Sequence, residues 1–193
     1  SMEDIVIPYI DEDISGQNTF NVSIWSDICH SIHVGSIFDQ WFSNALGVSC
    51  KLVYMPNSTN RLVDRKFSEH AETTRFSDGF PFLLLSEASV QDLNQRLAIN
   101  SAHLVSVENF RPNIVVEGCD AYAEDQWNNF SVGEITFNVV KPCTRCIITT
   151  INPNSGKSMG KEPLKTLNTY RKQGKSVVFG QNVLCRLSDV EST

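Results

Sequence analysis

The chain has 193 residues, of which 41% are hydrophobic, and it carries a formal net charge of −6. That length and apolar content suffice for one compact domain with an ordinary core. The negative balance argues against nonspecific binding to nucleic acid or to an anionic membrane, because both need a clustered positive surface. No apolar run in the sequence approaches the roughly 20 residues that a membrane-spanning helix needs.

The cysteines and the amino-terminal residues bear on compartment and domain limits. Six cysteines in a chain of this length are too few for a disulfide scaffold, and the sequence begins with no apolar leader. A reducing cytoplasm is therefore the default expectation. Residues 1–17 are acidic and lack a regular pattern, and Ser1-Met2 is typical of a cloning remnant, so one domain is predicted over residues 18–193.

The first half of the chain is predicted to alternate strands with two helices. Strands are predicted over 20–25, 31–35, 51–55 and 82–85. Helical spacing of apolar residues predicts a helix over 37–46 that Gly47 ends. Ser86 is predicted to cap a second helix through about Leu97, because its hydroxyl can accept from first-turn amides. Residues 56–78 are polar without a clear period and predict a long surface loop, which could act as a lid.

The second half is predicted to be mainly strands. Strand patterns cover 114–117, 134–140, 146–151 and 183–186. Between the last two, residues 152–156 have the composition of a turn, and Pro163 is predicted to open a helix through about Lys172. Because short strands separated by turns outnumber the inserted helices, we predict an α+β fold that is mainly β, built on a curled sheet or barrel.

The segment from Lys141 to Cys146 places two thiols, Cys143 and Cys146, beside the guanidinium of Arg145. A cationic neighbour favours the thiolate, the form of cysteine that binds metal or attacks an electrophile. Half a zinc ribbon has this spacing, but no second pair follows, so structural zinc is not expected. A thioredoxin-like dithiol would open a helix, whereas strand-forming residues follow here. Taken alone, the pair is more typical of buried, unreactive cysteines.

Two arginines and an acidic pair are further candidates. Arg111 and Arg145 have side chains that suit a phosphate or carboxylate, although a structural salt bridge is the commoner use of a single arginine. Asn113 is predicted to share a strand face with Arg111. Glu124 and Asp125, beside a tryptophan, could be an acid pair or two solvated carboxylates, and no catalytic dyad is proposed for them.

Five short strings follow one another in a specific order and spacing. They are Phe110-Arg111-Pro112-Asn113-Ile114-Val115, Ala123-Glu124-Asp125-Gln126-Trp127, Val132-Gly133, Cys143-Thr144-Arg145-Cys146 and Phe179-Gly180-Gln181-Asn182. Together they resemble the MOSC domain family, named for the molybdenum cofactor sulfurase carboxyl terminus. Further strings are most similar to the mitochondrial amidoxime-reducing component and its bacterial relatives: Ile148-Thr149-Thr150, Asn152-Pro153, Glu162-Pro163-Leu164 and Tyr170-Arg171.

The resemblance implies a MOSC-type β-barrel with inserted helices that binds the molybdenum cofactor, molybdopterin. It implies that Cys146 is both the protein ligand to molybdenum and the catalytic thiolate. The positions that hold the cofactor in relatives correspond to Arg111, Asn113, Thr144 and Arg145, and the loop with Asp78 and Gly79 would lie against the pterin. The residue chemistry agrees, because a soft thiolate suits a redox metal and arginines suit a phosphate.

The implied activity is the reduction of small N-hydroxylated compounds with two electrons from a donor protein or an iron–sulfur domain. The alternative is a noncatalytic cofactor-binding or sulfur-carrier module; a whole sulfurase also needs a pyridoxal-phosphate domain, for which this chain has no room. A third interpretation is a globular domain with two buried thiols. The expected location is the cytoplasm for a bacterial protein and the mitochondrion for a eukaryotic one.

The resemblance also bears on the two ends of the chain. Relatives carry a further barrel segment before the matched part and a closing strand after it, so the chain is expected to be either truncated at both ends or a reduced member of the family. We therefore expect the isolated chain to retain little molybdenum and to be inactive, because part of the anionic cofactor would be open to water.

Overall fold

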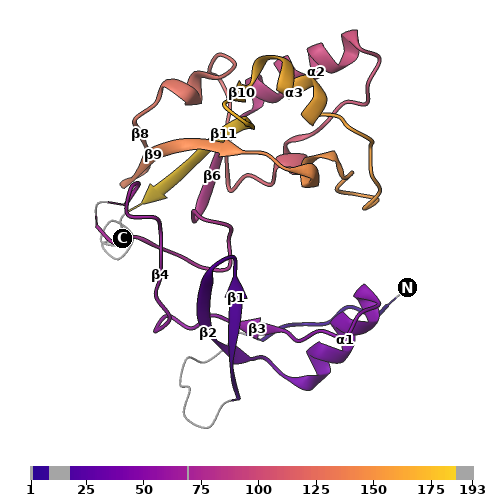
Figure 1. The fold of residues 1–193 in the computed structure, drawn as a ribbon, viewed down its shortest axis with the longest axis vertical. Coiled ribbons are helices and arrows are strands. Elements are labelled where there is room, and N and C mark those ends of the chain that lie inside the picture. Colours follow the sequence, from indigo (N-terminus) through magenta and orange to yellow (C-terminus); the bar gives the residue numbers. More distant parts are fainter. Residues whose placement is uncertain (1, 9–17, 69, 186–193) are drawn as a thin grey trace. The chain divides into compact units, whose positions relative to one another are not determined.

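The computed structural model of the chain describes residues 2–8, 18–68 and 70–185. Its described part divides into two units (Figure 1). Unit 1 contains the residues up to Leu62 together with 73–79, and unit 2 contains 63–72 together with the residues from Phe80 onward. The boundary predicted between residues 17 and 18 adjoins residues 9–17, which lie outside the described part.

Unit 1 is built from a three-stranded antiparallel sheet and one helix. The strands, in the order β1-β2-β3, are β1 (Thr19–Ile24), β2 (Asp27–His33) and β3 (Val53–Tyr54). Helix α1 (Ser36–Leu46) follows β2 and ends at Gly47, whose φ of 68° is a left-handed conformation that glycine adopts without strain. The strands and the helix predicted in this region are confirmed, with shifted strand ends.

The segment over 56–78 is more ordered than the predicted surface loop. It contributes a two-stranded antiparallel ladder of β4 (Arg61–Leu62) and β5 (Thr73–Thr74). Arg61 and Thr74 are 5% and 3% exposed, so part of the segment is interior. The expectation of an uninterrupted polar surface loop is therefore wrong, because strands of two residues are too short to leave a periodic signal in the sequence.

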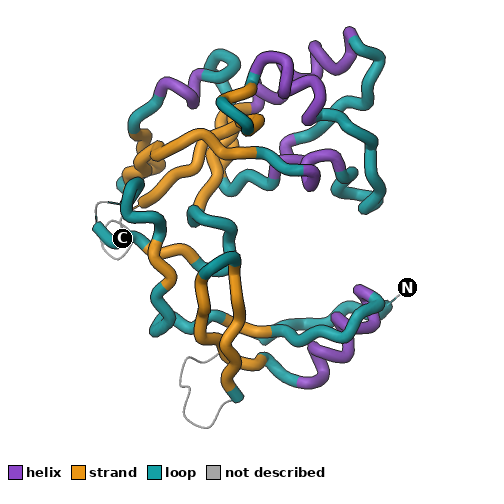
Figure 2. Tube along the Cα trace, viewed as in Figure 1, coloured by secondary structure: helices purple, strands orange, loops and turns teal. Residues whose placement is uncertain are grey.

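Unit 2 is built on a six-stranded sheet. Its strands are β6 (Phe82–Ser86), β7 (Ile114–Val116), β8 (Asn129–Val132), β9 (Ile135–Thr144), β10 (Lys172–Gln173) and β11 (Ser176–Cys185). The order is β7-β6-β11-β9-β8, with β10 paired to β11, and β6 with β7 is the parallel pair among antiparallel ones. In Figure 2 these strands form a curled sheet with two helices beside it, α2 (Glu87–Ile99) and α3 (Leu164–Tyr170).

The core of unit 2 lies on both faces of strand β6. Leu85 belongs to a cluster that joins α2 and α3 to the sheet, with Leu93, Leu97, Leu167 and Phe179 all fully buried. Its neighbour Leu84 packs in a second cluster, because successive side chains of a strand point to opposite faces. The second cluster contains Phe137 and Val183, from β9 and β11. The sheet is thus buried on both faces where β6, β9 and β11 adjoin.

Most elements predicted for unit 2 are confirmed. Ser86 caps α2, its hydroxyl accepting from the Ser89 amide at 3.1 Å, and Pro163 precedes α3. Strand β8 was not predicted, and β11 begins at Ser176, well before the predicted 183–186, whose last residue lies outside the described part. The predicted fold class, α+β and mainly β with inserted helices, is confirmed. None of the described helices has both the length and the apolar character that crossing a membrane requires.

The strand predicted over 146–151 is wrong. Ile147–Thr150 form a short 3-10 helix, η3, in which Ile147 and Ile148 are exposed. Two threonine hydroxyls donate to carbonyl groups three residues earlier, Thr149 to Cys146 at 3.0 Å and Thr150 to Ile147 at 2.7 Å. Such local side-chain bonds compete with strand formation, and here they outweigh the β propensity of the branched residues.

Strand β11 carries a bulge directly across from the cysteine motif. Val178 pairs with Thr144 and Gln181 with Pro142, so Phe179 and Gly180 together lie opposite the single residue Cys143. Gly180 has a φ of 73°, and a Cβ on it would come within 2.8 Å of the Leu84 carbonyl oxygen on β6. A bulge of this kind changes the direction of the side chains and carbonyls next to it, and only glycine fits this position without strain.

Replacing Gly180 by alanine is expected to lower the free energy of unfolding by about 2–4 kcal/mol, from left-handed strain and the close carbonyl contact. The matched control is Gly174→Ala, because Gly174 also has a positive φ of 58° but meets no atom within 4 Å of an added Cβ. The control should cost only about 1–2 kcal/mol. Urea unfolding followed by circular dichroism measures both variants, and equal losses would show that the close contact does not matter.

Candidate functional site

The two thiols of the motif lie in different local structures. Cys143 is partly buried in β9, which ends at Thr144. Cys146 is exposed and is the residue before η3, where its carbonyl accepts hydrogen bonds from the amide and the hydroxyl of Thr149. The interpretation of both cysteines as buried is therefore wrong. The thiol of Cys146 is accessible on backbone that local hydrogen bonds hold in place.

The guanidinium of Arg145 is held inside unit 2 by backbone carbonyl groups. Its Nε donates to the carbonyl of Phe179 at 2.8 Å and its Nη1 donates to that of Phe110 at 3.1 Å, while its centre lies 5.4 Å from the Phe110 ring. Burial lowers the pKa of Arg145, and charge on the Cys143 and Cys146 sulfurs acts in the opposite direction. The Arg145 side chain is thus a largely buried cation whose charge interacts with both sulfurs.

One nitrogen of this guanidinium has no hydrogen-bond partner among the described residues. Nη2 of Arg145 is buried and makes no hydrogen bond to any residue within 2–8, 18–68 or 70–185. A buried donor left unpaired costs free energy, more so when it is charged. The arrangement therefore favours an anionic oxygen supplied from outside the described chain, to which Nη2 could donate.

Arg111 and Asn113 do not share a strand face. Arg111 ends the 3-10 helix η1 (Val107–Phe110) with a φ of 55°, and β7 begins only at Ile114, so the prediction of a shared face is wrong. The Arg111 side chain is exposed, and its guanidinium makes no ion pair with another described residue. A non-glycine residue in left-handed conformation is uncommon and clusters at functional sites.

The other residues predicted to contact the cofactor lie in both units of the structure. Asn113 makes two hydrogen bonds with Leu83: its side-chain Oδ1 accepts from the Leu83 main-chain N–H at 2.9 Å, and its own main-chain N–H donates to the Leu83 carbonyl at 3.0 Å. Asn113 thereby joins the residue before β7 to β6. Thr144 is exposed at the end of β9. Asp78 and Gly79 lie in unit 1, where buried Arg61 binds the Asp78 carbonyl at 2.6 Å.

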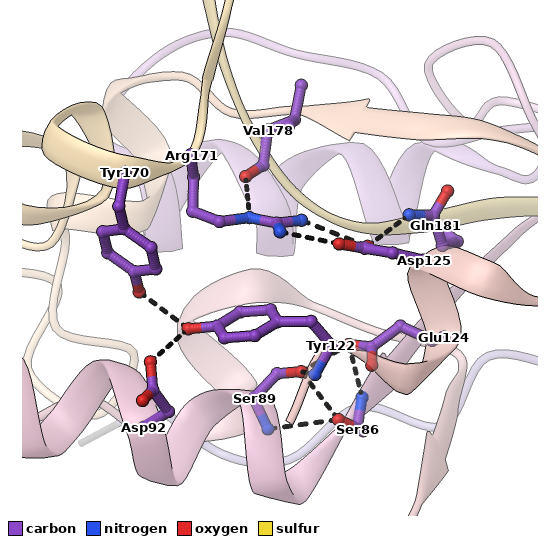
Figure 3. A network of polar contacts seen from close by, with 10 residues as sticks. All are labelled: Ser86, Ser89, Asp92, Tyr122, Glu124, Asp125, Tyr170, Arg171, Val178 and Gln181. Carbon is purple, nitrogen blue, oxygen red and sulfur yellow. Dashed lines mark hydrogen bonds and ion pairs between the residues drawn. The ribbon is translucent and has the colours of Figure 1, made fainter. Parts of the chain in front are cut away.

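A buried polar network underlies the bulge (Figure 3). Glu124 is only 1% exposed, and its Oε1 accepts from the Ser89 hydroxyl at 2.7 Å and from the Ser86 amide at 3.2 Å, at the amino terminus of α2. A carboxylate is stabilised there by the free amides and the helix dipole. The alternative of a solvated carboxylate is therefore wrong for Glu124.

Asp125 forms the second half of this network. Its carboxylate accepts two bonds from Arg171, at 2.6 and 3.1 Å, and one from the Gln181 amide at 2.6 Å. Arg171 also donates from Nε to the Val178 carbonyl at 3.3 Å. Figure 3 shows that these contacts reach Val178 and Gln181, the residues before and after the bulge along the chain. The carboxylate of Asp125 thus accepts from a residue of β11 and from Arg171, the residue that follows α3.

Two tyrosine hydroxyls connect this network to the helices: Tyr122 contacts Asp92 on α2 and Tyr170 on α3. The Tyr122 hydroxyl donates to Asp92 at 2.5 Å and lies 2.9 Å from the Tyr170 hydroxyl. Burial, with the hydrogen bonds to Asp92 and Tyr170, raises the pKa of Tyr122 far above its usual range, so the phenol stays protonated. Arg96, 2.7 Å from Asp92, holds the pKa of that carboxyl below its ordinary value.

Sequence reasoning missed the groups that hold Arg145. They are the main-chain carbonyls of Phe110 and Phe179, and a carbonyl acceptor leaves no signal in residue type. Only the strings around these residues pointed to the region. In the described part of the chain, no group of three or more histidine, cysteine or acidic side chains is placed to hold a metal ion.

Comparison with known proteins bears on this site. Mitochondrial amidoxime-reducing component 1 of Mus musculus is 42% identical over 156 residues, which are 74% of this chain and 44% of that protein. The human component 1 is 48% identical over 114 residues, or 55% of this chain and 33% of that protein. Component 2 of Macaca fascicularis is 33% identical over 174 residues, or 88% of this chain and 50% of that protein.

The chain therefore spans half or less of the length of these curated relatives. The family comparison matches the second part of the chain. The MOSC domain matches residues 71–192, a stretch that contains the Cys143–Cys146 motif, Arg145, the bulge on β11 and the network below it. Because this match covers more than half of the sequence, the chain belongs to the MOSC domain family.

Proposed function

We propose that this chain is the molybdenum-cofactor-binding domain of an oxidoreductase that reduces N-hydroxylated compounds, with the Cys146 thiolate as the protein ligand to the metal. The observation that carries the proposal is the pairing of an exposed thiol at Cys146 with the buried, unpartnered Nη2 of Arg145, its neighbour. Membership of the MOSC family and relatives named amidoxime-reducing components support it.

The residues present fit such a group. A thiolate is a soft ligand that suits a redox metal, and a single cysteine suffices where the cofactor itself supplies other ligands. Nη2 of Arg145 would donate to an anionic oxygen, the exposed Arg111 would add a second positive charge, and Thr144 offers a hydroxyl. Asn113 is proposed as a contact through its amide nitrogen, because its oxygen is occupied by Leu83. When bound, the cofactor supplies two-electron redox chemistry.

The other proposed features rest on resemblance. Asp78 and Gly79 remain proposed cofactor contacts. The electrons would come from a donor protein or an iron–sulfur domain, and the substrate would be a small N-hydroxylated compound. Of the two expected locations, the mitochondrion is the one that the names of the relatives support.

Metal and cofactor analysis of the longest natural form of the protein tests the proposal. After expression in cells that make the cofactor, we expect molybdenum to co-elute with the protein, a fluorescent pterin to be released on oxidation, and a reduced chemical donor to drive reduction of an aryl amidoxime. Zinc or iron at full occupancy without molybdenum would contradict the proposal.

The noncatalytic alternative uses the same exposed thiol. A sulfur-carrier module would show one added sulfur atom on Cys146 by intact mass after incubation with a cysteine desulfurase and cysteine. Cofactor binding without any amidoxime reduction, together with that added sulfur, would favour the carrier over the reductase.

A further inference from the structure

The ion pair between Arg171 and Asp125 contacts the residues on both sides of the Phe179–Gly180 bulge. On one side, Nε of Arg171 donates to the Val178 carbonyl at 3.3 Å. On the other, Asp125 accepts from the side chain of Gln181, which is 2% exposed, at 2.6 Å. The ion pair between Arg171 and Asp125, at 2.6 and 3.1 Å, joins the two sides (Figure 3).

One of the two bulge residues, Phe179, provides the shortest hydrogen bond to the Arg145 side chain. Phe179 offers its carbonyl to Nε of Arg145 at 2.8 Å, the shorter of the two side-chain bonds that orient this guanidinium. In a regular strand the carbonyl of a residue either joins the ladder or points away from it, in strict alternation. The extra residue of the bulge interrupts that alternation, which frees the Phe179 carbonyl for Arg145.

Space at the same point depends on Gly180. An added Cβ there would come within 3.4 Å of Nη2 of Arg145 as well as within 2.8 Å of the Leu84 carbonyl. The bulge therefore determines both the direction of Nε and the room around Nη2, the unpartnered nitrogen. A shift of the bulge would move both.

We infer that Arg171 and Asp125 are positioning residues for Arg145, acting through the bulge that their ion pair holds; the link to cofactor retention rests on the function proposed above. Neither side chain needs to touch the cofactor for this role. A bidentate arginine–carboxylate pair is suited to it, because its planar geometry fixes both partners more strictly than a single bond would.

The test is a double-mutant comparison in the longest natural form of the protein. Arg171→Ala is expected to speed the release of molybdenum by about five- to a hundredfold, measured by dialysis and elemental analysis. In an Arg145→Ala background the same change should add almost nothing, because the group that it positions is already absent. The free energy of unfolding should fall by similar amounts in both backgrounds.

A matched control lies in the same network. Arg96 pairs with Asp92 at 2.7 Å and stacks on Tyr170 at 4.1 Å, and among the described residues its side chain makes no hydrogen bond or ion pair with Asp125 or β11. Arg96→Ala should leave molybdenum release within about twofold of the wild type. If Arg171→Ala fails to fold, Asp125→Asn replaces it in the same double-mutant comparison, since it keeps the size of the side chain and removes the charge.

A readout without cofactor separates this inference from the proposed function. In proton–nitrogen spectra of the apoprotein, the Nε–H signal of Arg145 is expected to be protected from exchange in the wild type and in Arg96→Ala, and unprotected in Arg171→Ala. An unchanged signal in Arg171→Ala, or additive losses of molybdenum in the double variant, would overturn the inference. A wild-type protein that binds no molybdenum would overturn the proposed function, while the Nε–H signal would still decide the positioning role.

Discussion

Replacing Cys146 by serine is expected to abolish reduction of N-hydroxylated compounds and to remove the thiolate contribution from the molybdenum spectrum. Serine keeps the size of the side chain but offers a hard, weakly acidic oxygen that replaces thiolate poorly. The exposure of Cys146 at the start of η3 leaves its sulfur open to a ligand. Steady-state reduction of an aryl amidoxime and X-ray absorption at the molybdenum edge are the measurements.

The matched control is Cys143→Ser in the same motif. Cys143 is partly buried on β9 opposite the bulge, so we expect this variant to keep substantial activity and an unaltered metal spectrum. Equal loss in both variants would favour a dithiol site. Full activity of Cys146→Ser would end the hypothesis that this cysteine is the molybdenum ligand.

Replacing Arg145 by alanine is expected to weaken cofactor retention by about ten- to a hundredfold, because it removes a charge-assisted contact worth about 1.5–3 kcal/mol. It should also lower the free energy of unfolding, since the Phe110 and Phe179 carbonyls lose their donor. Lysine should rescue little, because one ammonium cannot reproduce the fork that serves two carbonyls and a ligand. Molybdenum content after dialysis and urea unfolding measure the two effects.

Arg111→Ala is the informative companion variant. The Arg111 side chain is exposed and makes no ion pair with another described residue, so its loss should weaken cofactor retention while the free energy of unfolding stays unchanged. Lower stability at unchanged molybdenum content in both arginine variants would mean that these residues serve the fold and that their assignment to the cofactor is wrong.

The local elements and the family were readable from the sequence alone. Helix α1 with its glycine end and α2 with its Ser86 cap depend on residues within a turn or two of each other, so pattern and composition predicted them. The strings around Cys143, Cys146 and Phe179 also carried the resemblance to the MOSC family, which the comparison confirmed. The predicted roles of Cys146 and Arg145 remain predictions that the geometry supports.

Tertiary structure decided what surrounds those residues. The 3-10 helix in place of the strand predicted after Cys146 is a local effect, because two threonine hydroxyls donate to carbonyls three residues earlier, but the contacts of Arg145 are not local. The carbonyls that orient Arg145 come from Phe110 and Phe179, which lie far from it in the sequence, and a main-chain acceptor has no signature in residue type. The bulge opposite Cys143 exists only in the pairing of β9 with β11. Register between distant strands is set by packing of the whole sheet, and no local pattern encodes it.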